Sequence, residues 1–108
     1  EFETITKTNS KWLYWSMSQQ LSHHTITGCN LNIGDLLASG TISGNTPDSL
    51  GSLLEITWNG TKPLYLKKSK LERCFLEDHD HITMTGWCQG SHYKIGFGQV
   101  AGKILPSQ

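Results

Sequence analysis

The chain has 108 residues, a length that fits one small domain able to bury roughly two thirds of its unfolded surface. Only 36% of the residues are hydrophobic, which leaves the core dependent on a few large side chains. The expected core residues are Trp12, Trp15, Trp58, Trp87, Phe75 and Phe97. Nine basic and nine acidic residues cancel, so neither nucleic acid nor an acidic membrane surface is expected as a partner.

The three cysteines, Cys29, Cys74 and Cys88, lack C-x-x-C spacing, and their odd number favours free thiols in a reducing compartment. A cytoplasmic location is therefore expected. The sequence has no apolar run near 18 residues and no charged-then-apolar leader, so neither a membrane span nor a signal peptide is predicted. The chain opens on Glu1 in a segment already rich in strand formers, which we interpret as the middle of a longer protein.

The first predicted element is an amphipathic helix over about residues 10–27, with Ser10 as its N-cap. Its apolar residues at every fourth position are Leu13, Met17 and Leu21. His23 and His24 fall in the last turns, where the helix dipole favours a protonated imidazole and a neutral one can pack. No third ligand follows at zinc-like spacing, so capping or packing is favoured over metal binding.

A glycine turn then leads to a predicted buried strand over residues 36–41 and a polar loop. Glycines flank Thr41-Ile42-Ser43 and would let the backbone approach a ligand closely, because glycine has no Cβ and tolerates positive φ. The Thr41 hydroxyl and the loop N–H groups would then bind a carbonyl or carboxylate. On the residues alone, a threonine that only satisfies local backbone groups stays an open alternative.

The next predicted strand covers residues 53–58, and Asn59-Gly60 is a two-residue hairpin signal that predicts a return strand over 61–66. Pro63 cannot donate to a ladder, which places that return strand at an edge or a bulge. Asn59-Gly60-Thr61 also matches a glycosylation acceptor, but without a secretory signal the hairpin is favoured. The last three predicted strands cover residues 71–76, 81–88 and 93–105. One helix followed by an antiparallel-rich sheet system is therefore expected.

Glu55 is the residue that this pattern singles out. It lies between apolar neighbours in a strand expected to be covered on both sides, where a carboxylate is costly unless it is hydrogen-bonded or paired. A carboxylate held in this way can orient a catalytic histidine. An exposed strand glutamate on a partly solvated face fits the pattern equally well, so the residues alone leave both interpretations open.

Two other candidate sites are weaker. The cluster His79-Asp80-His81 could bind a metal together with Cys74 or Cys88, but it is more typical of a turn between strands. The pattern Gly96-x-Gly98-x-x-x-Gly102 superficially suggests a dinucleotide loop, yet its spacing is one residue too long and no helix follows.

A series of motifs runs in order along nearly the whole chain: YWSMSQQLSHH at 14–24, GCNL at 28–31, GDLLASGTISG at 34–44, LE at 54–55, Trp58, GTKP at 60–63, Gly86, CQG at 88–90 and IGFGQ at 95–99. Together these motifs resemble the C-terminal end of the fumarylacetoacetase family. Only the first few residues and the loop at 67–73 match poorly. The resemblance implies a mainly β fold of the family's mixed β-sandwich roll type.

Members of that family hydrolyse a carbon–carbon bond in 4-fumarylacetoacetate, giving fumarate and acetoacetate in the last step of tyrosine catabolism. The resemblance implies a homodimer and a divalent cation, Mg²⁺ or Ca²⁺, that binds the substrate's oxygens. It also implies that a histidine activates water, that a glutamate orients this histidine, and that the metal with a lysine and an arginine stabilises the departing carbanion.

Carried over by position, Glu55 matches the catalytic glutamate that holds the base histidine, and Thr41 matches a threonine that hydrogen-bonds the substrate. The base histidine, the acidic metal ligands, the lysine and the arginine belong to parts of the family's chain that precede this segment. His23 and His24 match a helix pair and not the base. Residues 1–108 are therefore expected to form a single C-terminal segment of a larger catalytic domain, supplying one wall of the site and inactive alone.

Two alternatives stay open. Within the superfamily, an acylpyruvate hydrolase or an oxaloacetate decarboxylase is the next candidate, although Gly40-Thr41-Ile42-Ser43-Gly44 departs from the Gly-Thr-Pro pattern common there. From a different class, the chain is a non-catalytic fragment or paralogue that only folds, dimerises or binds. An Asp and Glu-x-Glu metal set plus a histidine upstream in the parent chain would favour the enzyme.

Overall fold

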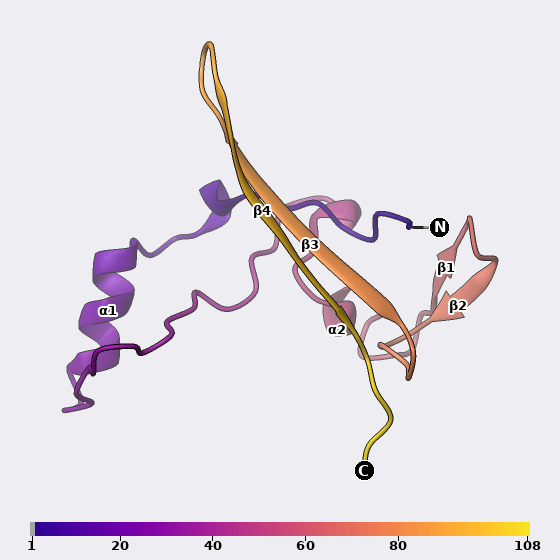
Figure 1. The fold of residues 1–108 in the computed structure, drawn as a ribbon, viewed down its shortest axis with the longest axis horizontal. Helices are drawn as coiled ribbons and strands as arrows, with labels where there is room; N and C mark the ends of the chain where they lie inside the picture. The colour runs from indigo at the N-terminus through magenta and orange to yellow at the C-terminus, as the bar shows by residue number, and fades with distance from the viewer. Residues whose placement is uncertain (1) are drawn as a thin grey trace. The chain divides into compact units, whose positions relative to one another are not determined.

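The computed structural model describes residues 2–108 and divides the chain into two compact units, Glu1–Cys74 and Phe75–Gln108. Its regular elements are short helices and two small antiparallel sheets of two strands each, as expected of a mainly β domain (Figure 1). No helix in the described chain combines the length and apolar character that a membrane crossing requires.

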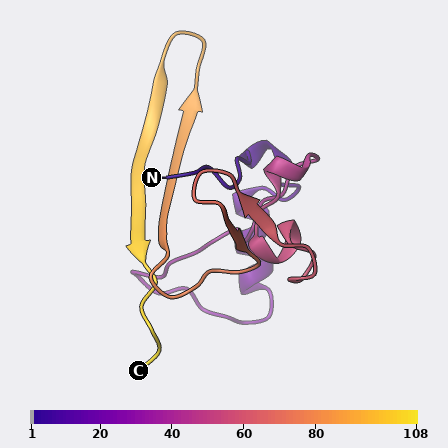
Figure 2. The same ribbon diagram turned by 90° about the vertical axis from the view of Figure 1, so that its right-hand side faces the viewer.

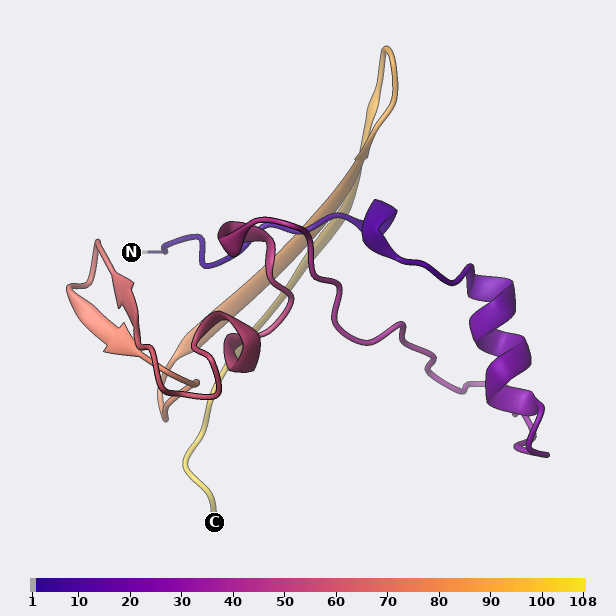
Figure 3. The same cartoon turned by 180° about the vertical axis from the view of Figure 1, so that it is seen from behind.

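The N-terminal unit holds both α-helices and the smaller sheet. Its elements in chain order are η1 (Ser10–Trp12), α1 (Met17–Thr25), η2 (Pro47–Ser49), α2 (Leu53–Ile56), β1 (Leu64–Leu66) and β2 (Leu71–Arg73). The strands β1 and β2 pair antiparallel, with Tyr65 opposite Glu72, and follow α2 in the ribbon (Figure 3). The segment between α1 and η2, as described, contains neither helix nor strand.

The helix α1 is shorter than predicted and begins at a different cap. Ser16 Oγ accepts the Gln19 N–H at 3.3 Å, while Gln19 Oε1 accepts the Ser16 N–H at 2.8 Å, which makes a capping box. Ser10 instead begins η1, and Leu13 is already extended. The prediction of one helix from Ser10 was therefore wrong in its start, and α1 buries none of its side chains.

The predicted strand over residues 36–41 is absent. The structure describes this segment as extended chain with no ladder partner, and Leu36 is 96% exposed where burial was expected. An apolar run becomes a strand only when another strand pairs with it, because isolated extended backbone leaves its amide groups to water. None of the described strands pairs with residues 36–41, so Thr41 lies on a loop.

The predicted strand over residues 53–58 is a short helix, α2. Ser52 is its N-cap and accepts the Glu55 N–H at 3.3 Å. Trp58, Asn59 and Gly60 then adopt left-handed φ values of 50°, 55° and 78°. Positive φ at Asn-Gly suits a helix C-terminus as well as a hairpin turn, and here it ends the helix.

The hairpin predicted at Asn59-Gly60 was consequently wrong. The N-terminal hairpin turns instead between Leu66 and Leu71, where Lys70 has a φ of 58°. The return strand predicted over residues 61–66 shrinks to Leu64–Leu66, which starts directly after Pro63. Pro63 has no amide hydrogen to donate to a strand ladder, so a strand is expected to start after it.

The C-terminal unit is one long hairpin, drawn from orange to yellow in Figure 2, in which β3 (His81–Gln89) pairs antiparallel with β4 (Lys94–Lys103). Both predicted strands are confirmed, with ends that shift by one or two residues. Thr85 pairs with Gln99 and Trp87 with Gly96, so one extra residue bulges on β4. Gly98 lies at this bulge with a φ of 75°.

A hydrophobic core is missing from residues 2–108. Only two side chains in the described chain are buried, Ser49 and Thr57, and both are polar. The six aromatic residues predicted to form the core are between 41% and 70% exposed, so that prediction was wrong. Their hydrophobicity was identified correctly, but no second layer of described structure covers them. A two-stranded hairpin is only marginally stable without such cover.

We therefore predict that the 108-residue chain expressed alone gives a poorly dispersed proton NMR spectrum. Burial of apolar side chains is the main favourable term in folding, and no apolar side chain of the described residues is fully buried. The comparison spectrum is that of the same chain in concentrated urea, which should differ little in dispersion. Well-resolved upfield methyl signals from the chain alone in dilute buffer would show that the isolated chain does build a core.

Candidate functional site

The candidate site lies where residues 41–51 contact the short helix α2. The Ser43 Oγ donates a hydrogen bond of 2.5 Å to Oε2 of Glu55, twelve residues further along the chain. The same oxygen accepts the Gly51 N–H at 2.9 Å. One hydroxyl thus joins the loop that carries Thr41, the segment before α2, and the carboxylate on α2.

Glu55 lies in the first turn of α2 and is exposed. It lines an open hollow of about 340 Å³ together with Leu50, Leu54 and Trp58. Glu55 was expected to be buried on a covered strand, but it lies on a helix and is exposed. Its exposure agrees with the alternative interpretation of a glutamate on a solvated face. The carboxylate therefore borders apolar walls and is held by a hydroxyl rather than by burial.

Thr41 lies on the same loop, two residues before Ser43, and is exposed. Two residues of chain span at most about 7 Å, so the Cα atoms of Thr41 and Ser43 are no further apart than this. Within residues 2–108 the Thr41 hydroxyl has no hydrogen-bond partner. Ser43 thus links the loop that carries Thr41 to Glu55, and neither Thr41 nor Glu55 lies on a strand.

The glycines that flank Thr41 have different surroundings. Gly40 has the positive φ that the sequence predicted, 79°, and a Cβ there would meet nothing within 4 Å. A Cβ on Gly44 would overlap Ser49 Oγ and lie 2.9 Å from Trp12 Nε1. The close approach at Gly44 is therefore made by the chain's own side chains and not by a ligand.

Gly51 is a site residue that sequence reasoning missed. A Cβ at this position would lie 2.7–2.9 Å from backbone atoms of Ile42, the residue next to Ser43. Real Cβ atoms essentially never come this close to backbone, so the loop can lie against Gly51 only because no side chain is there. Gly51 lies between Leu50 and Ser52 and belongs to no turn dipeptide, so no sequence pattern indicated its role.

The two buried hydroxyl groups stabilise the segments on either side of this contact. Ser49 Oγ accepts the Thr46 N–H at 3.1 Å and donates to the Thr46 carbonyl at 2.9 Å. Thr57 is fully buried, and its Oγ1 donates to the Leu53 carbonyl at 2.8 Å and accepts the Gly60 N–H at 3.0 Å. Polar contacts therefore fix the loop and the end of α2 in place of an apolar core.

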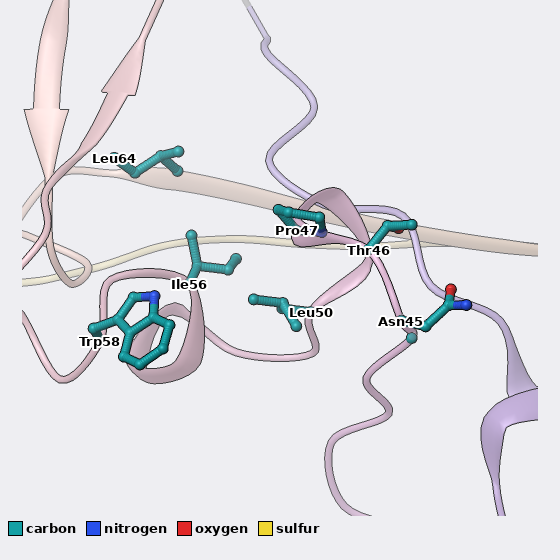
Figure 4. A pocket seen from close by; sticks show the side chains of 8 residues that line it. Asn45, Thr46, Pro47, Leu50, Ile56, Trp58 and Leu64 are labelled. Carbon is teal, nitrogen blue, oxygen red and sulfur yellow. The ribbon is translucent and has the colours of Figure 1, made fainter.

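A second open hollow, of about 470 Å³, adjoins the same helix (Figure 4). Its lining residues are Gly44, Asn45, Thr46, Pro47, Leu50, Ile56, Trp58 and Leu64. In Figure 4 the side chains of Leu50, Ile56 and Trp58 gather beside α2. Leu50 and Trp58 border both hollows, so the surface next to Glu55 is predominantly apolar.

Metal-ligating side chains do not gather in the described part of the chain, where no group of three His, Cys, Asp or Glu could hold an ion. His23 and His24 lie in the last turn of α1, as predicted, and His24 Nε2 lies 3.4 Å from Cys29 Sγ. His79 lies in the turn before β3, with its N–H on the Ile104 carbonyl. All three cysteines have free thiols.

A comparison with protein families matches residues 2–105 to the model described as fumarylacetoacetate (FAA) hydrolase C-terminal. The chain belongs to this family. It is 57% identical to the fumarylacetoacetase of Homo sapiens over 104 residues, which are 96% of this chain and 25% of that protein. This extent of the match confirms the resemblance drawn from the motifs.

Fumarylacetoacetases of other species match the chain over a similar length. The chain is 57% identical to the fumarylacetoacetase of Arabidopsis thaliana over 103 residues, which are 95% of the chain and 24% of that protein. It is 47% identical to the fumarylacetoacetase of Caenorhabditis elegans, again over 95% of the chain and 24% of that protein. The chain thus spans about a quarter of the length of the curated relatives it matches.

We predict that Gly51→Ala lowers the free energy of unfolding of a full-length FAA hydrolase containing this chain by about 1–3 kcal/mol, because the added Cβ forces Ile42 and Ser43 away. Thermal or urea unfolding measures this loss. Gly96→Ala is the matched control, since a Cβ there meets nothing within 4 Å in the structure. Equal stability of the Gly51→Ala and unaltered proteins would contradict the close loop contact.

Proposed function

We propose that this chain is the C-terminal part of a fumarylacetoacetase, which hydrolyses the carbon–carbon bond of 4-fumarylacetoacetate to fumarate and acetoacetate. The observation that carries the proposal is the 57% identity to human fumarylacetoacetase along 96% of the chain. The relatives with that name favour this activity over the acylpyruvate hydrolase and oxaloacetate decarboxylase alternatives. The reaction belongs to tyrosine catabolism, and the substrate is a small molecule.

Under this proposal the exposed apolar faces are covered by the rest of a longer chain. The β3–β4 hairpin has every residue of β4 exposed, and α1 buries nothing among the described residues. A mixed β-sandwich roll, completed by strands outside this chain and assembled as a homodimer, would supply the missing layer. The free thiols of Cys29, Cys74 and Cys88 suit a cytoplasmic enzyme.

Glu55 is proposed to hold the base histidine, which comes from outside this chain. A carboxylate that accepts one ring N–H of an imidazole fixes the tautomer and orientation of the ring, so that the other nitrogen can take a proton from water. Glu55 is exposed beside an open hollow, and such a position lets a histidine from another segment reach it. One carboxylate oxygen is already occupied by Ser43, which leaves the other for the ring.

Thr41 is proposed to bind the substrate. Its hydroxyl is exposed and has no hydrogen-bond partner among residues 2–108, so it can donate to a carbonyl or carboxylate oxygen of 4-fumarylacetoacetate. The N–H groups of the same loop are suited to the same oxygens. Thr41 and Glu55 would thus form one wall of the pocket, with the substrate against the loop and the base histidine against α2.

The divalent cation that the family implies does not fit the residues of this chain. No three metal-ligating side chains come together within residues 2–108, and the carboxylate of Glu55 is instead bound to a serine hydroxyl. The cation, Mg²⁺ or Ca²⁺, is therefore proposed to be held by acidic residues elsewhere in the longer protein. The roles given to Glu55 and Thr41 do not depend on it.

We predict that Glu55→Gln in the full-length enzyme lowers kcat by about a hundredfold to ten-thousandfold and changes KM much less. The amide keeps the shape of the side chain but cannot stabilise the imidazolium that forms when the histidine takes a proton. Steady-state kinetics that follow the loss of 4-fumarylacetoacetate measure both constants.

Two further variants are measured alongside, of which the first is the control. Glu72→Gln makes the same change on the exposed β2 and should leave both constants unaltered. Thr41→Val removes the hydroxyl proposed to bind the substrate and should raise KM more than it lowers kcat. An unchanged kcat in Glu55→Gln would remove Glu55 from the mechanism.

A further inference from the structure

We propose that Ser43 is a positioning residue of this site, which sets the orientation of the Glu55 carboxylate and, through it, of the base histidine. The proposal rests on the function given above for Glu55. The sequence places Ser43 in the glycine-flanked segment Thr41-Ile42-Ser43 without giving it a role, and the structure alone connects it with α2. Four observations on the described residues carry the argument.

The direction of the Ser43 hydrogen bond is fixed by its neighbours. A serine hydroxyl has one proton to donate and accepts with its lone pairs. The Gly51 N–H already donates to this oxygen at 2.9 Å, and the carboxylate of Glu55 has no proton to give when ionised. The Ser43 proton therefore lies on the 2.5 Å contact to Glu55 Oε2, which has the short length typical of an O–H···O⁻ bond.

Ser43 itself is held from both sides. Ile42, before it, lies against Gly51 so closely that no side chain fits there. Gly44, after it, donates its N–H to the Ser49 carbonyl at 2.8 Å. Ser49 is in turn one of the two buried residues of the described chain. The hydroxyl is therefore presented from backbone that is anchored on each side.

Glu55 depends on this hydroxyl for its orientation. An exposed glutamate side chain has several rotatable bonds and loses conformational freedom when it is fixed. Among residues 2–108, Ser43 is the one group that hydrogen-bonds the carboxylate of Glu55. The helix α2 is only four residues long, so it positions the Glu55 backbone but not its carboxylate.

The loop also couples the two proposed site residues. Thr41 is two residues from Ser43, so the segment that contacts the substrate is the segment that orients Glu55. A charge-assisted bond of this kind is strong enough to choose one rotamer of Glu55. Removing the Ser43 hydroxyl should therefore lower the rate of the chemical step without weakening the binding of substrate at Thr41.

The test is steady-state kinetics of Ser43→Ala in the full-length enzyme with 4-fumarylacetoacetate. We expect kcat to fall about tenfold to a hundredfold, as for the loss of one hydrogen bond to a charged group, with KM changed less than threefold. Ser43→Thr keeps the hydroxyl and should retain most of the kcat. A merely structural role of the hydroxyl, through its bond to the Gly51 N–H, would instead lower the thermal stability and disturb KM as much as kcat.

Ser39→Ala is the matched control, because Ser39 lies on the same loop and its hydroxyl donates only to the adjacent Gly40 carbonyl. This variant should keep the kcat of the unaltered enzyme. If Ser43→Ala does not fold, Ser43→Cys fills nearly the same space with a weak donor and should show the same loss of kcat. Full turnover in a folded Ser43→Ala or Ser43→Cys protein overturns the proposal.

The same series separates this inference from the proposed function. A large loss of kcat in Glu55→Gln together with full turnover in Ser43→Ala overturns only the role of Ser43. Unaltered kcat in Glu55→Gln overturns the role of Glu55 and with it that of Ser43. A loss in both, restored by Ser43→Thr, supports both.

Discussion

The hydrogen bonds of the Ser43 hydroxyl hold together the part of the molecule on which the proposed chemistry depends. Ser43 accepts from Gly51 and donates to Glu55, and so links three stretches of chain that the secondary structure leaves separate. No strand pairing connects these stretches, and no apolar side chain of the described residues is buried beneath them. Short-range, directional hydrogen bonds therefore set the arrangement of the candidate site.

This dependence explains the distribution of buried groups. Ser49 and Thr57 are the buried side chains of the described chain, and each satisfies backbone groups of a turn or a helix end. A hydrogen bond adds about 0.5–1.5 kcal/mol of net stability, whereas a fully buried large apolar side chain adds about 1.5–3 kcal/mol. Such hydrogen bonds specify local geometry well, but they contribute little to the free energy of unfolding of the whole chain. Burial of the exposed aromatic residues against further protein would supply the larger contribution.

The sequence predicted the two strands of the long C-terminal hairpin well, with ends that differ by one or two residues. It failed at residues 53–58, since a short apolar run fits either a strand or a helix, and the Ser52 cap decides for the helix. The signal at Asn59-Gly60 failed for a similar reason, because positive φ suits both a hairpin turn and a helix end. The true start of α1, in contrast, was readable from the Ser16–Gln19 capping box.

The candidate site was predictable only in part. The residue pattern singled out Thr41 and Glu55 and the family resemblance gave them roles, while Ser43 and Gly51 carry no pattern that links them to a carboxylate. Their role follows from a contact between residues eight and twelve positions apart, which depends on the folded path of the loop. The core could not be predicted from this chain at all, because it requires a second layer that residues 2–108 do not contain.

The most direct test of this account is a double-mutant cycle on kcat in the full-length enzyme with Ser43→Ala, Glu55→Gln and the two changes together. If Ser43 acts through the carboxylate of Glu55, the effects are not additive, and the double variant is about as slow as Glu55→Gln alone. If the two losses multiply, so that the double variant is slower by the full factor of the Ser43→Ala change, the two residues act independently and the account is contradicted.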